Sequence, residues 1–291
     1  MNLSSPAQVA ELLRKHNLQP RKRFGQNFLI DFNTLQKIIR SASVELGDGV
    51  CEIGSGLGVL TIALSEAVGP EGRVVTIEVD DHILPALMES IAGRENVVSV
   101  QADALEIEWP MLIASNFGVD RKIKLVANIP YNITTPILSK LLENKTSLSC
   151  IVLLVQKEVA DRLVAKPDTA NYGSLSVFAQ YHARVESVGV VSRKVFYPAP
   201  DVDSAIVRLT PYIRPVDVPH DEQLFFRVVR AAFGQRRKAL PNALSGDPAL
   251  DWSRERATYA LQCSNIDPRR RGETLTISEF ILISNAGEVF E

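Results

Sequence analysis

The sequence predicts an α/β fold with a mostly parallel sheet, followed by a smaller all-helical domain. Two observations carry this prediction. Short, nearly continuous apolar runs alternate with helix-like segments through the first two thirds of the chain, and such runs are typical of strands that are buried on both faces. This alternation is typical of a parallel sheet whose strands are joined through helices. Residues 221–291, in contrast, show helical periodicity and little strand character.

The predicted strands follow one another in order along the chain. Five buried strands are expected at 49–53, 73–79, 97–102, 123–128 and 150–156, with helices between them, for example at 58–68 and 134–145. Two later strands, 183–192 and 204–211, are separated by a proline-rich loop and fit an antiparallel pairing at the sheet edge. The segment after Pro211 is rich in breakers and reads as a linker. We therefore expect an α/β domain at 1–213, with a basic segment at 1–28, and a helical domain at 214–291.

The charge of the chain is unevenly distributed. Its net charge is only −2 over 291 residues, so the total does not argue for nucleic-acid binding. Five Lys/Arg residues lie in 1–28 against one acid, and 227–238 holds five more and no acid. These two basic runs predict a phosphate-binding face; the alternative is solvated helix surfaces unrelated to any partner.

Cysteine, histidine and apolar patterns exclude several classes of protein. The three cysteines form no CxxC pair, and Cys51 and Cys150 lie in apolar runs, which indicates buried thiols in a reducing compartment. The four histidines are never at metal-ligand spacing, so we expect no metal. No apolar run is long enough to span a membrane, and the N-terminus lacks the apolar core of a signal peptide, so a cytoplasmic protein is expected.

A glycine-rich turn follows the first predicted strand, in EIGSGLGVLT (52–61). Such a turn lets backbone amides approach a ligand at a helix N-terminus. It is not a dinucleotide fingerprint, because Val59 stands where the third glycine would fall, and it lacks the Gly-Lys-Ser/Thr of a P-loop. The pattern E-x-G-x-G-x-G, with Gly54, Gly56 and Gly58, resembles motif I of the S-adenosylmethionine-dependent methyltransferases.

Carboxylates end the next two predicted strands. Glu78 lies twenty residues after Gly58, where it can accept the ribose hydroxyls of an adenosine-bearing cofactor. Asp103 can accept a hydrogen bond from the exocyclic amine of the cofactor's adenine. Alone, each feature has a simpler explanation, a structural turn or a helix cap. Together they converge on one crevice at the carboxyl edge of the sheet and favour S-adenosylmethionine over NAD.

The fourth predicted strand ends in Asn-Ile-Pro-Tyr, residues 128–131. The exocyclic amine of adenine is a poor nucleophile, and two acceptors, the Asn128 side-chain carbonyl and the Ile129 main-chain carbonyl, can bind its hydrogens and localise its lone pair. Pro130 fixes the loop, and Tyr131 can stack on an unstacked base. The alternatives are Asn128 as a helix cap and Tyr131 as a core residue; the expected cap is instead Thr135, before Pro136. The motif matches motif IV of amino-directed methyltransferases.

Several longer segments resemble the ribosomal RNA adenine dimethyltransferases of the small subunit. The segments are, in order, RKRFGQNFLID (21–31), EIGSGLGVLT, IEVD, QADAL, NIPYNITTPIL (128–138), VQKEVADRL (155–163), YGSLSV (172–177) and VFYPAPDVDSAIVRL (195–209). Within them GQNFL and FYPAPDVDSAIV are narrower signatures than the glycine turn, and FFRVVRAAFGQRRKALPNAL (225–244) resembles the start of the family's helical domain. The resemblance implies a Rossmann-like class I methyltransferase domain with a seven-stranded sheet, a helical RNA-binding domain, and dimethylation of two adjacent adenosines in the 3′-terminal hairpin loop of small-subunit rRNA, on a precursor of the 30S particle late in assembly.

The resemblance also implies roles for individual residues. The cofactor would contact eight residues: Asn27, Leu29, Gly54, Gly56, Glu78, Asp103, Ala104 and Asn128. Phe196 would face Tyr131 across the target base; its alternative is a core residue at a strand end. Phosphates of rRNA would be held by two basic clusters: Arg21, Lys22 and Arg23, and, at the start of the helical domain, Arg236, Arg237 and Lys238. Ser55 departs from the family, in which proline is frequent at this position.

Three other functions fit parts of the pattern. One is the large-subunit adenine methyltransferase type associated with macrolide resistance. Another is a non-catalytic RNA-binding factor in ribosome assembly or transcription, and the third is a DNA adenine methyltransferase, for which the C-terminal region leaves little room. Nothing resembles a coiled-coil seam, so a monomer is expected.

Overall fold

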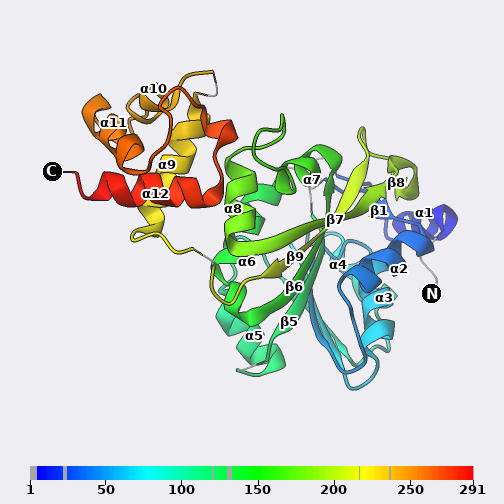
Figure 1. Cartoon of the computed structure of the whole chain (residues 1–291). Helices are drawn as coiled ribbons and strands as arrows, with labels where there is room; N and C mark the ends of the chain where they lie inside the picture. Colours follow the sequence, from blue (N-terminus) through cyan, green and yellow to red (C-terminus); the bar gives the residue numbers. More distant parts are fainter. Residues whose placement is uncertain are drawn as a thin grey trace. The chain divides into compact units, whose positions relative to one another are not determined.

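The computed structural model describes residues 5–21, 25–119, 121–129, 133–215, 217–235 and 237–290. The chain divides into two compact units, Met1–Ala160 with Arg184–Pro211, and Asp161–Ala183 with Tyr212–Glu291 (Figure 1). We call them the α/β unit and the helical unit. This division differs from the expected boundary at residue 213, because the segment 161–183 packs with the C-terminal helices. Within the described residues, no helix is both long enough and apolar enough to cross a membrane.

The elements of the α/β unit follow the predicted alternation. They are α1 (Pro6–Lys15), β1 (Phe28–Leu29), α2 (Phe32–Ser41), β2 (Gly49–Ile53), α3 (Val59–Val68), β3 (Arg73–Glu78), α4 (Leu84–Ser90), β4 (Val97–Gln101), α5 (Trp109–Phe117), β5 (Ile123–Asn128), α6 (Thr134–Glu143), η3 (Lys145–Ser147), β6 (Leu148–Gln156), β7 (Ala183–Val191), η4 (Arg193–Val195), β8 (Phe196–Tyr197) and β9 (Ser204–Pro211). Helix α7 (Lys157–Leu163) leads from this unit into the other.

The main sheet has seven strands in the order β4-β3-β2-β5-β6-β9-β7. Strands β4, β3, β2, β5 and β6 are parallel, and β9 pairs antiparallel with β6. The predicted α/β fold is therefore confirmed, and each of the seven expected strands is present within two residues of its expected bounds. Strands β7 and β9 are neighbours at the edge, as expected. The order of strands reverses between β2 and β5, and such a point is where α/β sheets bind ligands.

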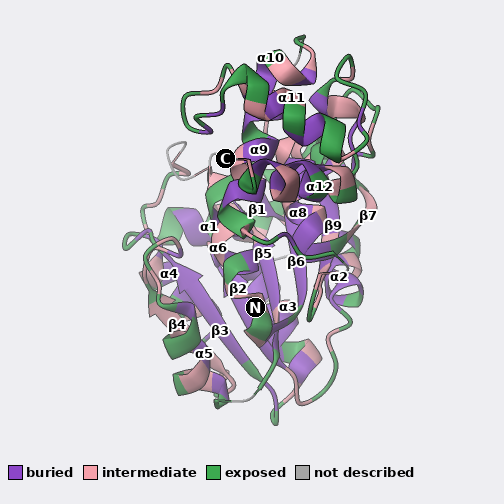
Figure 2. Ribbon diagram, turned by 60° about the vertical axis from the view of Figure 1, so that its left-hand side comes forward, coloured by how far each residue is buried: buried purple, intermediate pink, exposed green. Residues whose placement is uncertain are grey.

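Alternate residues of the strands build the core on one face of this sheet, because successive side chains of a strand point to opposite faces. Val50, Val74, Val126, Val152 and Ile206 belong to one buried cluster with residues of α1, α2 and α3. Helices α2 and α3 contact each other, and α3 contacts β2 and β3. Figure 2 shows the central strands as buried, which explains their nearly continuous apolar sequences.

Strands β1 and β8 form a separate two-stranded antiparallel sheet that sequence patterns did not predict. Phe28 pairs with Tyr197 and Leu29 with Phe196, and the Ile30 amide donates to the Val195 carbonyl at 2.9 Å. Two segments that the sequence singled out separately, 21–31 and 195–209, are thus hydrogen-bonded neighbours.

The helical unit contains α8 (Ser174–His182), α9 (Glu222–Gly234), α10 (Leu240–Leu244), α11 (Arg254–Cys263), η5 (Gly272–Thr274) and α12 (Ile277–Glu288). Side chains cap three of these helices: Asp221 caps α9, Ser253 caps α11, and Thr276 with Glu279 forms a capping box at α12. Its core joins residues of the segment 161–183 to those of the C-terminal helices, among them Tyr172, Val177, Tyr181, Phe225, Trp252 and Phe280. The described part of 212–290 contains no strand, as predicted.

Candidate active site

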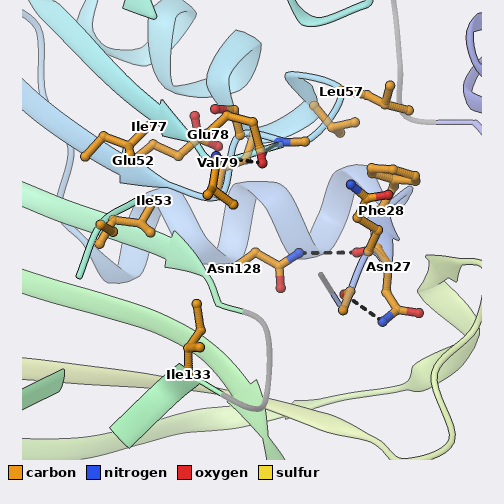
Figure 3. A pocket seen from close by; sticks show the side chains of 18 of the residues that line it. Asn27, Phe28, Glu52, Ile53, Leu57, Ile77, Glu78, Val79, Asn128 and Ile133 are labelled. Carbon is orange, nitrogen blue, oxygen red and sulfur yellow. Dashed lines mark hydrogen bonds between the residues drawn. The ribbon is translucent and has the colours of Figure 1, made fainter. Parts of the chain in front are cut away.

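A cavity of about 290 Å³ lies in the α/β unit, at the carboxyl ends of β2, β3, β4 and β5 (Figure 3). All eight residues that the sequence assigned to the cofactor line it: Asn27, Leu29, Gly54, Gly56, Glu78, Asp103, Ala104 and Asn128. They come from five separate places in the sequence, which folding brings to one edge of the sheet.

The glycine turn approaches two other walls of this cavity closely. Gly54 and Gly56 have φ of +80° and +55°, which residues with side chains adopt only with strain. A Cβ atom at Gly54 would lie 3.2 Å from the Asn128 carbonyl, and one at Gly56 would lie 3.1 Å from the Phe28 ring. Glycine is therefore required both for the backbone conformation and for the close contact with β5 and β1.

The Glu78 carboxylate is buried and holds the end of the glycine turn. It accepts hydrogen bonds from the Gly56 amide at 2.8 Å and from the Val79 and Asp80 amides at 3.0 Å each. Burial raises its pKa, and the three backbone hydrogen bonds oppose that rise. A carboxylate offers about four acceptor positions, so these bonds leave about one for a ligand. The expectation that Glu78 accepts two ribose hydroxyls would require one of these three bonds to be released.

Asp103 lies across the cavity, after β4. Its Oδ1 accepts a hydrogen bond from the Leu105 amide at 2.8 Å. Among the described residues nothing donates to its Oδ2, which therefore keeps its acceptor capacity for a ligand.

Two further polar groups line the cavity and were not assigned a role from the sequence. Glu52 is fully buried; its Oε2 accepts from the hydroxyls of Thr61 and Thr76 at 2.5 and 2.7 Å, and its Oε1 has no partner in the part of the chain that the structure describes. Burial is the main cause that raises the Glu52 pKa to about 7. Ser55 is 5% exposed, and its hydroxyl also lacks a partner among the described residues. The sequence did carry a signal for the role of Glu52, because an acid inside an otherwise apolar run, here GVCEI, is rarely buried without a function or a partner.

These groups fit S-adenosylmethionine. The unpartnered polar atoms belong to Glu52, near the end of β2, and to Ser55, on the glycine turn before α3. The ammonium group of the cofactor's amino acid end would find a carboxylate acceptor there, and its carboxylate would find a hydroxyl and the first amides of a helix. Glu78 and Asp103 offer acceptors for ribose hydroxyls and an adenine amine. The remaining lining is mostly apolar, as for most cofactor sites. No group of side chains within the described residues could hold a metal ion.

Asn128 ends β5 and has a defined orientation. Its Nδ2 donates to the main-chain carbonyl of Asn27 at 3.4 Å, and the Asn27 side chain in turn donates to the Gly25 carbonyl at 3.0 Å (Figure 3). The Asn128 Oδ1 is therefore the atom left to accept a hydrogen bond from a substrate. Ile129 is buried and its side chain does not line the cavity. Pro130 and Tyr131 lie outside the described residues.

Asn128 is not the cap of the next helix. Helix α6 begins at Thr134 with Ile133 at the N-cap position, and no side chain caps it. The prediction that Thr135 caps this helix is wrong, because Thr135 lies inside its first turn. The prediction failed since the chain enters the helix through Ile133, two residues before Thr135.

Phe196 is 4% exposed and packs in the core of the α/β unit. This burial agrees with its alternative interpretation as a core residue at a strand end. The role of Phe196 as a partner of the target base stays a prediction.

The basic residues have different surroundings from those expected. Arg21 does not stand free: its Nη1 lies 3.2 Å from a carboxylate oxygen of Asp80. Arg237 and Lys238 are exposed, but they follow α9 and therefore lie inside the helical unit rather than at its start. Lys22, Arg23 and Arg236 lie outside the described residues.

The fold and the cavity define a class I S-adenosylmethionine-dependent methyltransferase. Comparison with known proteins narrows this class: residues 17–283 match the family described as "Ribosomal RNA adenine dimethylase". The chain is 46% identical to the "Ribosomal RNA small subunit methyltransferase A" of Moorella thermoacetica, over 97% of this chain and 98% of that one. This chain belongs to the ribosomal RNA adenine dimethylase family, and it is an S-adenosylmethionine-dependent enzyme.

Two solved structures are also similar. A dimethyladenosine transferase from Plasmodium falciparum superposes with a TM-score of 0.73 at 25% identity, covering 88% of this chain and 95% of the other. The 23S rRNA methyltransferase ErmE superposes with a TM-score of 0.66 at 26% identity, covering 90% of this chain and 100% of the other.

Proposed function

We propose that this enzyme dimethylates the exocyclic N6 of two adjacent adenosines in the 3′-terminal hairpin loop of small-subunit rRNA, during late assembly of that subunit. The relative from M. thermoacetica, matched over almost its whole length, is named as a small-subunit enzyme. We also infer that it acts in the cytoplasm as a monomer on the precursor particle.

The observation that carries the chemistry is the orientation of Asn128. Its amide nitrogen donates to the Asn27 carbonyl, which leaves its oxygen as the atom available to accept a hydrogen bond from a substrate. An acceptor at this place binds an amine hydrogen of adenine and directs the nitrogen lone pair towards the reacting group. The Ile129 main-chain carbonyl is the second acceptor in this proposal. Bound S-adenosylmethionine supplies an electrophilic methyl group on its sulfonium.

The experiment tests substrate and residue together. Small subunits that lack the terminal-loop methylation are incubated with labelled S-adenosylmethionine, and the nucleosides are then analysed by mass spectrometry. We expect dimethyladenosine from the wild type and a rate at least about 100-fold lower from Asn128→Ala, with cofactor affinity changed little. Asn116→Ala is the matched control, because the Asn116 amide bonds within α5, outside the cavity. An Asn128→Ala variant as fast as this control would contradict the role of Asn128.

A large-subunit substrate is the second candidate, because ErmE is similar over 90% of this chain. Large-subunit RNA is therefore the parallel substrate in the same assay. Methylation of that RNA alone would assign this chain to the second candidate. Binding of small subunits without any transfer would make it a non-catalytic assembly factor.

A further inference from the structure

A buried carboxylate beside the cofactor cavity has no role in the proposed chemistry. Asp80 is 2% exposed, in the turn that follows Glu78. Its oxygens accept hydrogen bonds from the Gln26 side-chain amide at 2.7 Å, the Arg21 guanidinium at 3.2 Å and the His82 backbone amide at 3.3 Å. The Gln26 Oε1 accepts from the Arg21 amide at 2.8 Å. Asp80, Gln26 and Arg21 thus form a closed ring of hydrogen bonds, which we call the Asp80 ring.

The Asp80 ring joins two walls of the cofactor cavity. Gln26 is followed directly by Asn27, Phe28 and Leu29, which line the cavity. On the other side, the Asp80 amide donates to Glu78, whose carboxylate holds the glycine turn. The N-terminal wall is therefore tied to the end of β3 through one side chain.

The same ring reaches the catalytic asparagine. The Asn27 carbonyl accepts the hydrogen bond from Asn128 Nδ2, and its position follows from where Gln26 is held. A shift of this segment would release the amide nitrogen of Asn128 and so allow its side chain to rotate.

Two residues of the ring's N-terminal side, Arg21 and Gln26, border open space rather than only packed side chains. They line a second cavity of about 420 Å³, together with Leu13, Leu18 and Asp80 among others. Hydrogen bonds are directional, so they can fix a backbone that is not tightly packed. Buried ion pairs often add little net stability, which makes positioning the more fitting role for this one.

We propose that Asp80 is a positioning residue: through Gln26 it fixes the 25–29 wall of the cofactor cavity, and through the Asn27 carbonyl it fixes the orientation of Asn128. The part that concerns Asn128 rests on the proposed function. Loss of the ring weakens cofactor binding and lowers the rate of methyl transfer, while the fold is retained.

The test compares Asp80→Asn with Asp81→Asn. Asparagine has the shape of aspartate but places an NH₂ group against the donors of Arg21 or Gln26, which opens the ring. Asp81 is the neighbouring carboxylate, its side chain is 68% exposed, and its one ion pair within the described residues, to His82, is 3.6 Å long. The control therefore removes the same charge near the cavity without touching the ring.

Three quantities are measured on the full-length protein. Calorimetry with S-adenosylmethionine should give a Kd about tenfold higher for Asp80→Asn and within about twofold of wild type for Asp81→Asn. Amide hydrogen exchange should become faster at residues 25–29 and stay unchanged in the rest of the α/β unit. Thermal unfolding checks that the fold is retained; a purely structural role would instead lower the midpoint and weaken protection throughout the unit.

Gln26→Ala provides a second variant that leaves Asp80 in place. If both residues act through one ring, the double variant should bind S-adenosylmethionine no more weakly than the poorer single variant. Unchanged affinity in Asp80→Asn, equal weakening by Asp81→Asn, or fully additive effects with Gln26→Ala would each overturn the proposal.

Cofactor binding and hydrogen exchange require no RNA. A wild-type protein that methylates no RNA would therefore refute the proposed function without affecting these results. Conversely, a normal transfer rate in Asp80→Asn would refute the effect on Asn128 while the proposed function stands.

Discussion

Glu52 should make the stability of the α/β unit depend on pH. Burial raises its pKa from 4.5 to about 7, so between these values the folded state binds a proton that the unfolded state does not. The stabilisation is fully present below pH 4.5 and is lost as the pH rises through about 7. A pKa difference of this size between the folded and the unfolded state corresponds to about 3 kcal/mol of unfolding free energy.

Glu52→Gln removes this titration. The glutamine carbonyl can still accept the hydrogen bonds from Thr61 and Thr76, and its amide occupies the place of the unpartnered Oε1. All other titrating groups are common to both proteins and cancel in the difference. The stability of the variant relative to wild type should therefore increase by about 3 kcal/mol between pH 5 and pH 8.

The two tryptophans make the measurement specific. Trp109 is buried in the α/β unit and Trp252 in the helical unit, so a Trp252→Phe background leaves one fluorescent probe in the unit that contains Glu52. Urea unfolding is followed at both pH values, without cofactor. The argument would be refuted if the unfolding free energies of the wild type and of Glu52→Gln changed equally with pH. That result would show that Glu52 is ionised in both the folded and the unfolded state.

Three further predictions concern other parts of the chain. Ser55→Ala should raise the Kd of S-adenosylmethionine about fivefold in calorimetry, and leave that of 5′-methylthioadenosine, which lacks the amino acid end, unchanged. Burial raises the pKa of the Cys51 thiol far above its ordinary range, so a thiol-reactive dye should label the exposed Cys263 at once and Cys51 only after unfolding. Gly287→Ala places a Cβ 2.1 Å from the Trp252 ring, and should cost the helical unit roughly 3 kcal/mol in urea unfolding followed by Trp252 fluorescence. The first argument would be contradicted if Ser55→Ala weakened the binding of both ligands equally. Rapid labelling of Cys51 would contradict the second, and an unchanged stability of the helical unit in Gly287→Ala would contradict the third.

The strands, and the turn residues at their carboxyl ends that line the cavity, were predictable from local patterns. A strand of a parallel sheet that is buried on both faces is a continuous apolar run, and 49–53, 123–128 and 204–211 have the predicted bounds. Acids and glycines after such strands meet at one edge of the sheet, so the cavity lining followed from the positions of the motifs.

Other features depend on contacts between distant residues, which no periodicity encodes. Gln26 meets Asp80 across 54 residues of sequence, and the same carboxylate pairs with Arg21, whose role as a phosphate ligand stays a prediction. An aromatic residue suits both a stacking role and a core position. The sequence alone therefore could not show that Phe196 is buried. The cap of α6 was misplaced because Thr135 before Pro136 is a good local cap signal that the actual backbone path overrides.

The assignment of 161–183 to the helical unit changes how the protein can be divided. A fragment that ends at residue 213 keeps Tyr172, Val177 and Tyr181 but loses the helices that cover them, so it would expose an aromatic surface and tend to aggregate. The Tyr212 amide donates to the His182 carbonyl at 2.9 Å. The two segments of the helical unit are therefore adjacent at this point, and a short linker from residue 183 to residue 212 yields a continuous chain for studying that unit in isolation.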